Sequence, residues 1–130
     1  MHYHFIIPAY NESQRLPSFL KHLLPEIEKS TSEISFRVVD DGSSDPEKQQ
    51  LSPHLIELES KHNSLLETLY LKSNLGKGGA VYQGWNACPD CDYLGFIDAD
   101  GSIQATELLT LVDQAEARHS EAPSLFASRV

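Results

Sequence analysis

The stretch YLGFIDADG at residues 93–101 joins a short apolar run to an acidic turn. The apolar run, residues 93–97, has the length and composition of a buried strand. The turn that follows it contains two carboxylates, Asp98 and Asp100, one residue apart. A buried strand that ends in polar side chains is typical of α/β sheets, in which ligands bind at the carboxyl ends of the strands.

Two stretches upstream repeat this pattern. The apolar run FII at residues 5–7 is ended by Pro8 and followed by a loop at residues 9–13. A second strand is predicted over residues 34–39, and it ends at the turn-rich DDGSSD of residues 40–45. Further strands are predicted over residues 65–71 and 124–128.

Helical segments alternate with these strands. Apolar residues recur at helical spacing from Leu16 to Ile27, and a polar helix is predicted over residues 46–62. A third helix, residues 80–87, is entered from the glycine-rich loop of residues 74–79. Thr106 is predicted to cap a last helix. Its inward-facing residues are Leu108, Leu109, Leu111, Val112 and Ala115. This alternation predicts an α/β fold with a mainly parallel sheet and helices on both faces.

Polar side chains gather after three of the predicted strands. They are Asn11, Glu12, Asp40, Asp41, Asp45, Asp98 and Asp100. Because the carboxyl ends of parallel strands meet at one edge, these side chains are expected to lie together there. His2 and His4 lie at the opposite end of the first strand and are expected to be surface residues.

Composition narrows the classes of function. The chain has 130 residues and a net charge of −9, which indicates one domain, or part of one, over residues 1–130. The negative charge argues against nucleic acid as a partner. There is neither a long apolar run nor a charged leader, so we expect no membrane span or signal peptide and a cytoplasmic location. Cys88 and Cys91 are best explained as an incidental pair in a loop, because no second pair completes a metal site.

Carboxylates on one turn are hard oxygen ligands, so Asp98 and Asp100 predict a site for Mg²⁺ or Mn²⁺ that would bridge diphosphate oxygens. An inert, solvated acidic turn is the alternative. A carboxylate in the second loop could accept from the base or ribose of a nucleotide. Lys77 either lies beside the diphosphate or belongs to a flexible connection, and the absence of the P-loop spacing excludes a Walker site.

Four loops in this order resemble the glycosyltransferase family 2 domain. They are PAYNE at residues 8–12, DDGSSD at 40–45, NLGKGGA at 74–80 and DADG at 98–101. The last two are most similar to dolichyl-phosphate and polyprenyl-phosphate β-glucosyltransferases. The resemblance implies a Rossmann-like GT-A fold and metal-dependent, inverting transfer. It further implies a nucleotide-sugar donor such as UDP-glucose and an acceptor such as a polyprenyl phosphate, reached at the cytoplasmic face of a membrane.

The resemblance also implies roles for individual residues. The positions that match nucleoside-binding residues are Pro8, Tyr10, Glu12, Val39 and Asp41. Asp98, Ala99 and Asp100 match the metal and diphosphate motif, with both aspartates toward the ion. Arg129 matches an arginine near the donor phosphates. Ser102 stands where mannosyl relatives often have a metal-contacting glutamine, which argues against a GDP-mannose donor.

Family domains continue beyond Val130, so the GT-A domain is expected to be C-terminally incomplete here. The catalytic base is expected beyond Val130, and this chain alone is expected to bind donor, to transfer little sugar and to self-associate. Two alternatives remain. Asp98 also fits the nucleophile motif of a haloacid-dehalogenase-type phosphatase, and the chain could be a nucleotide-binding fragment without turnover.

Overall fold

The computed structural model describes residues 1–88, 90–118 and 126–127. The elements in chain order are β1 (His2–Ala9), α1 (Leu16–Glu28), β2 (Glu33–Asp40), α2 (Asp45–Lys61), β3 (Leu69–Tyr70), α3 (Gly76–Asn86), β4 (Tyr93–Phe96), α4 (Ala105–Arg118) and β5 (Phe126–Ala127). The strands form one sheet in the order β3-β2-β1-β4-β5, and every pairing is parallel. The predicted α/β fold with a parallel sheet is confirmed.

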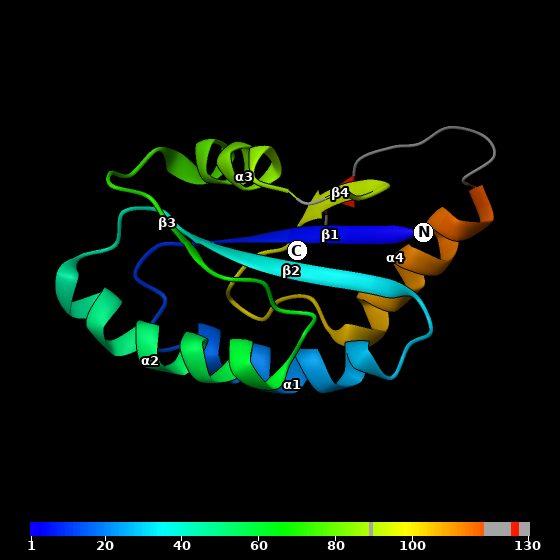
Figure 1. The fold of residues 1–130 in the computed structure, drawn as a ribbon, viewed down its shortest axis with the longest axis horizontal. Coiled ribbons are helices and arrows are strands. Elements are labelled where there is room, and N and C mark those ends of the chain that lie inside the picture. Colours follow the sequence, from blue (N-terminus) through cyan, green and yellow to red (C-terminus); the bar gives the residue numbers. More distant parts are fainter. Residues whose placement is uncertain (89, 119–125, 128–130) are drawn as a thin grey trace.

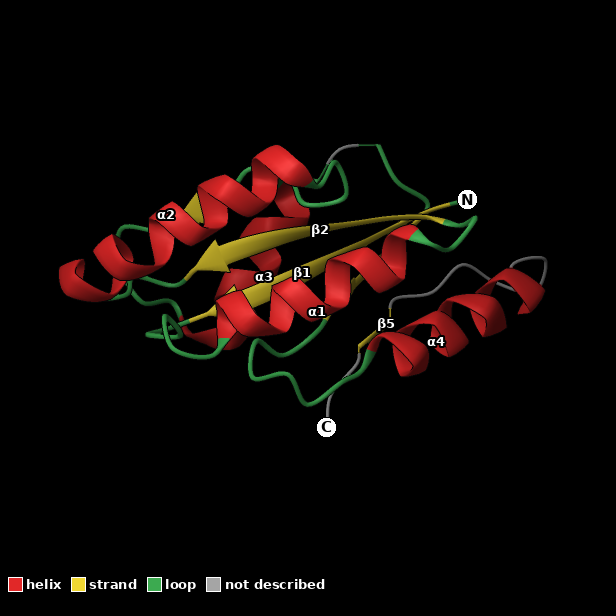
Figure 2. Ribbon diagram, turned by 90° about the horizontal axis from the view of Figure 1, so that it is seen from below, coloured by secondary structure: helices red, strands yellow, loops and turns green. Residues whose placement is uncertain are grey.

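Helices cover both faces of the sheet. Helices α1, α2 and α4 lie on one face and α3 lies on the other (Figures 1 and 2). Alternate residues of β1 divide accordingly: Phe5 and Ile7 belong to the large core under α1, α2 and α4, whereas Ile6 packs with Ala80 and Val81 of α3. The period-2 alternation of a strand therefore supplies two cores from one apolar run.

Strand β1 runs through Pro8, where the sequence predicted its end. Along β1, the carbonyl of Ile6 accepts from Ile97 on the β4 side, and the carbonyl of Ala9 accepts from Asp41 on the β2 side. Pro8 has the same orientation as Ile6, so its missing N–H would point to the side on which β4 has already ended at Phe96. A proline costs no ladder bond at such a position.

Helix α3 approaches the sheet closely because residue 84 is glycine. A Cβ atom at Gly84 would lie 2.7 Å from Cδ1 of Ile6 and 2.9 Å from Cγ2 of Val39. Both distances are too short for real carbon contacts, so a larger residue would push α3 away from the sheet. The start of α3 carries the glycine-rich run, and this packing holds that run at the carboxyl edge of the sheet.

Three expectations about local structure are corrected. Helix α3 begins at Gly76, so most of the predicted glycine-rich loop is helix. Strand β3 is confined to Leu69–Tyr70, with an isolated bridge from Leu65 to Phe36. Between these pairings, the N–H and hydroxyl of Thr68 both donate to Oε2 of Glu59 in α2, at 3.0 and 2.7 Å, which diverts the backbone from β2.

The third correction concerns the start of α4. Thr106 lies inside the first turn of α4 and does not cap it, because the helix begins at Ala105. The preceding residue, Gln104, donates its backbone N–H to Oε1 of Glu107 at 3.0 Å. A glutamate that reaches back to the residue before a helix is half of a capping box.

The expectation that His4 is a surface residue is also wrong, because His4 is fully buried. No helix within the described residues combines the length and apolar character that crossing a lipid bilayer requires.

Candidate functional site

The loops after β1 and β2 are held together by hydrogen bonds between their ends. The backbone N–H of Asn11 donates to Oγ of Ser43 at 2.9 Å, and Oδ1 of Asn11 accepts from the N–H of Ser44 at 3.3 Å. Ser43 in turn donates to both carboxylate oxygens of the buried Asp40, from its hydroxyl at 2.6 Å and its N–H at 3.0 Å. Asp40 and Asn11 therefore shape the edge of the sheet. Asp45 starts α2 and is exposed.

Asp41 connects the second loop to the start of α3. Its Oδ1 accepts from the backbone N–H of Leu75 at 2.7 Å, and its side chain is almost fully buried. Beside it, Gly42 has a φ of 71° and lies so close to the chain that a Cβ atom would be 2.6 Å from the nitrogen of Asn74. The glycine permits both the turn and this approach, so the glycine-rich run is anchored to the end of β2.

An open pocket of about 350 Å³ lies beside these contacts, at the carboxyl edge of the sheet. Its lining residues are Pro8, Ala9, Tyr10, Glu12, Asp41, Asn74, Gly76, Lys77, Asp98, Ala99 and Asp100. The structure thus brings together eight residues that the sequence singled out: Pro8, Tyr10, Glu12, Asp41, Lys77, Asp98, Ala99 and Asp100. They come from loops up to 92 positions apart in the chain, from Pro8 to Asp100.

Of the predicted donor-binding residues that the structure describes, only Val39 is not in this pocket. The side chain of Val39 is fully buried under α3 and does not line the pocket. Arg129 lies outside the described residues, as do Ser124 and Ser128 at the ends of the predicted fifth strand. Conversely, Asn74 lines the pocket but was not predicted to do so, although it belongs to the glycine-rich run.

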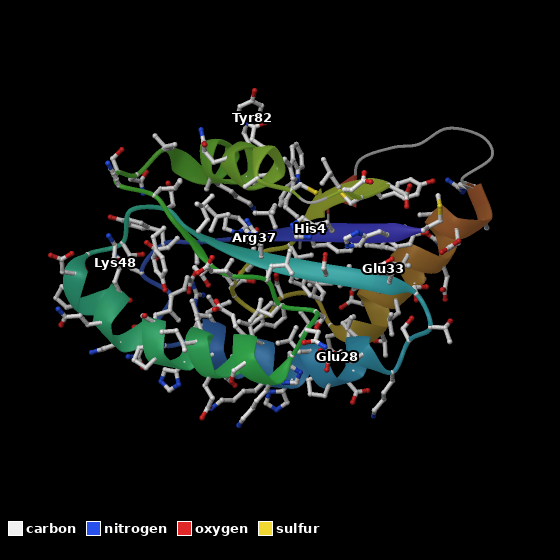
Figure 3. All side chains as sticks on the ribbon, in the orientation of Figure 1. His4, Glu28, Glu33, Arg37, Lys48 and Tyr82 are labelled. Atoms are coloured by element: carbon white, nitrogen blue, oxygen red, sulfur yellow. The ribbon has the colours of Figure 1, made fainter. Side chains whose placement is uncertain are left out.

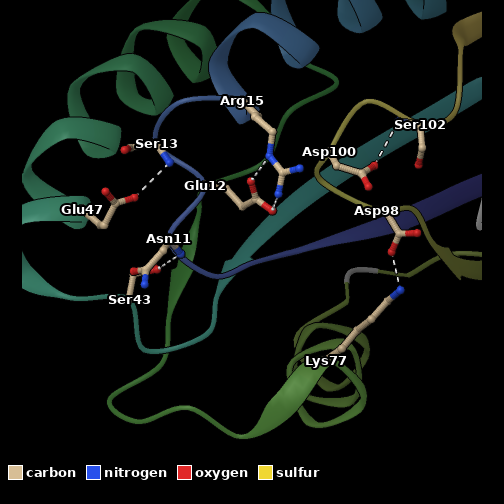
Figure 4. A network of polar contacts seen from close by, with 10 residues as sticks. All are labelled: Asn11, Glu12, Ser13, Arg15, Ser43, Glu47, Lys77, Asp98, Asp100 and Ser102. Atoms are coloured by element: carbon tan, nitrogen blue, oxygen red, sulfur yellow. Dashed lines mark hydrogen bonds and ion pairs between the residues drawn. The ribbon is translucent and has the colours of Figure 1, made fainter.

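Glu12 and Arg15 form a bidentate ion pair on the wall of the pocket. Nε and Nη2 of Arg15 donate to the two carboxylate oxygens of Glu12 at 2.8 and 2.7 Å (Figure 4). The bond to Glu12 raises the pKa of the Arg15 guanidinium. On the far side of this pair is a larger cavity of about 810 Å³, bordered by Arg15, Phe19 and Ile103 and sharing Asp100 with the pocket.

Lys77 reaches across the pocket to the acidic turn after β4. Its ammonium pairs with Oδ1 of Asp98 (Figure 4). The same ammonium lies 5.2 Å from the centre of the Phe96 ring. Asp98 is the more sheltered partner, with 18% of its side chain exposed against 52% for Lys77. Lys77 therefore lies in the first turn of α3, and its side chain lines the pocket.

Asp100 is the more exposed carboxylate of the turn. Its Oδ1 accepts from the backbone N–H of Ser102 at 3.0 Å. The hydrogen bonds to Ser102 hold the pKa of Asp100 below its usual value, and the nearby Arg15 guanidinium acts in the same direction. Asp100 is thus kept ionised at the mouth of the pocket.

The turn fits a metal ion that is held jointly with a ligand. Among the described residues, no group of three His, Cys, Asp or Glu side chains could hold a metal ion. Two carboxylates with further ligands from phosphate and water suit Mg²⁺ or Mn²⁺, which keep several non-protein ligands. Asp98 and Asp100 fit this arrangement, and the protein alone does not form a closed metal cage.

The sequence is similar to those of known proteins. Residues 4–125 match the sequence profile of the family described as Glycosyl transferase family 2. The dolichyl-phosphate beta-glucosyltransferase of Dictyostelium discoideum is 38% identical over 104 residues, which is 76% of this chain and 31% of that protein. The undecaprenyl-phosphate 4-deoxy-4-formamido-L-arabinose transferase of Proteus mirabilis is 32% identical over 85% of this chain and 32% of that protein.

The fold also has relatives among solved structures. The crystal structure of S. aureus TarS 1-349 superposes with a TM-score of 0.65 at 22% identity, covering 92% of this chain and 33% of that one. This likeness supports the GT-A fold. The chain spans about a third of the length of the curated relatives it matches.

Proposed function

Because this chain belongs to glycosyltransferase family 2, we propose that its pocket binds the nucleotide-sugar donor of an inverting, metal-dependent sugar transfer. One observation carries the proposal: Glu12, Asp41, Asp98 and Asp100 converge from three loops on one pocket, which also contains Lys77. In a phosphatase, Asp98 would be a nucleophile; the family membership leaves that alternative without support.

The nucleoside is proposed to bind at the inner end of the pocket. Tyr10 is half exposed and offers a ring face to a base, and Asp41 offers a carboxylate to an imide N–H or to ribose hydroxyls. Asp41 is held in place by its bond to Leu75. Glu12 is held by Arg15 in the same way. Fixed acceptors of this kind favour a bound nucleoside, because little side-chain entropy remains to be lost.

The diphosphate is proposed to lie between α3 and the acidic turn. Asp98 and Asp100 would hold a divalent ion there, and the ion would supply charge stabilisation for the departing diphosphate. Lys77 adds a positive charge on the α3 side of the same space. Gly76 and Gly78 leave the backbone next to Lys77 uncrowded, since a Cβ atom at either position would meet nothing within 4 Å.

The sugar and the acceptor are proposed from the relatives. Their names point to a lipid phosphate as acceptor and, in one of them, to glucose, so we propose UDP-glucose as donor and a polyprenyl phosphate at a membrane surface as acceptor. Nucleotide binding without sugar transfer is the second form of this proposal, because the pocket residues named above are all assigned to the donor.

Isothermal titration tests the donor site. UDP and GDP are titrated into the protein in Mn²⁺ and, separately, in EDTA. We expect UDP to bind in Mn²⁺, to bind more tightly than GDP, and to lose most of its affinity in EDTA. Equal affinity for UDP with and without the metal would contradict metal-dependent donor binding, and tighter binding of GDP would contradict the uridine assignment.

A further inference from the structure

The ion pair between Lys77 and Asp98 places a positive charge where the proposed donor site requires a metal ion. We propose that Lys77 competes with the divalent ion for Asp98 in the free protein and moves to the phosphate oxygens when metal and nucleotide bind together. This inference rests on the proposed donor site. It makes Lys77 a residue that couples the binding of metal to the binding of nucleotide.

The charges around the pocket make Lys77 the natural counterion of Asp98. Among the described residues that line the pocket there are four carboxylates, those of Glu12, Asp41, Asp98 and Asp100, and one ammonium, that of Lys77. The nearby guanidinium of Arg15 is already bonded to Glu12 at both carboxylate oxygens. Without a bound ligand, Lys77 therefore neutralises part of a strongly acidic site.

The backbone of Lys77 is fixed, whereas its side chain is able to move. Asp41 holds the residue before α3 through the N–H of Leu75, and Asn74 accepts from the N–H of Gly76 at 3.1 Å. About half of the Lys77 side chain is exposed, and a lysine has a flexible four-carbon stem with three rotatable donors. The ammonium is therefore able to leave Asp98 while its Cα atom stays in place.

Oδ1 of Asp98 cannot bind the ammonium of Lys77 and a divalent ion at full strength at the same time. A divalent ion at Oδ1 would bring its charge next to the ammonium of Lys77, and like charges at contact distance repel. When a diphosphate arrives with the metal, its oxygens offer the ammonium a new partner in the same pocket. Metal alone should then bind weakly, and metal with nucleotide should bind with positive cooperativity, which by linkage is the same for both ligands.

Replacing Lys77 by methionine should change the affinities for Mn²⁺ and for UDP in opposite directions. In Lys77→Met, Mn²⁺ alone should bind about two- to fivefold more tightly, which corresponds to the loss of a partly exposed ion pair. UDP in saturating Mn²⁺ should bind about tenfold more weakly, because a charged hydrogen bond to phosphate is lost. A residue that merely supported the fold would weaken both.

Electron paramagnetic resonance of free Mn²⁺ measures metal binding without nucleotide, and titration of UDP measures the second step. Lys72→Met removes the same charge from an exposed lysine that does not line the pocket, so both affinities should stay unchanged in it. Lys77→Arg retains the charge and should retain weak binding of Mn²⁺ alone. The urea midpoint of each variant, measured without metal, verifies that it is folded.

The outcomes separate this inference from the donor site. If wild-type protein binds UDP with Mn²⁺ but Lys77→Met leaves the affinity for Mn²⁺ alone unchanged or lower, the competition at Asp98 is wrong while the donor site stands. If wild-type protein binds no UDP even in Mn²⁺, the donor site is wrong and this inference is overturned with it.

Discussion

The two edges of the sheet both gather polar side chains, yet they do so in different ways. At the amino edge, the side chains bond to one another: Nε2 of His2 and Nδ1 of His4 share Oγ of Ser35, at 2.7 and 2.6 Å. At the carboxyl edge, Glu12, Asp41, Asp98 and Asp100 line an open pocket. Figure 3 labels His4 at the first of these edges, and Figure 4 shows Glu12, Asp98 and Asp100 at the second. The amino edge also borders a cavity, of about 500 Å³, so the two edges differ in charge and not in the presence of a cavity. The pocket at the carboxyl edge has four carboxylates and one ammonium, which leaves it negatively charged.

The amino edge is further tied to the chain before β4. Nδ1 of His2 lies 3.0 Å from the carbonyl oxygen of Asp90, and the backbone N–H of His2 donates to Oδ2 of Asp92 at 2.8 Å. These bonds join the start of β1 to the connection between α3 and β4. We therefore assign the amino edge to stability and the carboxyl edge to binding, and the following experiments test that division.

The largest effect is expected from removing a charge at the carboxyl edge. Asp98→Asn or Asp100→Asn should lower the affinity for UDP in Mn²⁺ at least about a hundredfold, because two charges 4 Å apart near a protein surface interact by about 4 kcal/mol. Calorimetry measures the loss. The urea midpoint should change little, and a variant that kept the wild-type affinity would remove Asp98 or Asp100 from the metal site.

Acid should act mainly on the amino edge. Burial, with the nearby Arg37 and His2, lowers the pKa of His4 to about 4. Below its ordinary pKa of 6.5, the unfolded chain takes up a proton that the folded chain excludes, so stability falls as the pH drops from 6.5 to 4. The full loss is about 3 kcal/mol.

Urea unfolding at several pH values between 4.5 and 7.5 measures this loss. His4→Gln should flatten the profile in that window. The lowered pKa of Glu28, which rests on its bonds from Ser64 and His62, contributes stability that is lost only below about pH 4.5. An equally steep profile in His4→Gln would show that another group controls acid stability.

Asp41→Ala tests whether one residue of the carboxyl edge contributes both to UDP binding and to stability. We expect UDP binding to weaken by about 1–3 kcal/mol, the usual cost of leaving a polar partner unpaired. Stability should also decrease, because the N–H of Leu75 loses its acceptor. Calorimetry and urea unfolding on the same samples measure both changes, and unchanged UDP binding would place the nucleoside away from Asp41.

Ser35→Ala is the matching change at the amino edge, with the smallest expected effect. It removes the hydroxyl that both histidines share, and we expect a loss of about 1–2 kcal/mol in the free energy of unfolding. UDP affinity should not change, because Ser35 lies at the far end of β2 from the pocket. A weaker affinity for UDP would show that the two edges are coupled.

The sequence by itself determined the order of strands and helices along the chain and, together with the family resemblance, eight of the eleven residues that line the pocket. Short apolar runs followed by polar loops require a parallel sheet whose carboxyl ends meet, so Asp41 and Asp98 had to lie near each other. Local periodicity is enough for this, because the connection rules of α/β folds leave few alternatives.

Tertiary structure decided what each of these residues does. The period-2 alternation of residues in β1 and β2 does not indicate which face of the sheet α3 covers. The burial of His4 and of Val39 therefore could not be predicted from it. Helix α3 begins at Gly76. The residue before it, Leu75, donates its backbone N–H to Asp41, which lies 34 positions earlier in the chain. The pairing of Lys77 with Asp98 likewise depends on how close α3 packs to the sheet. Contacts between distant segments depend on packing distances, which no local pattern of residues encodes.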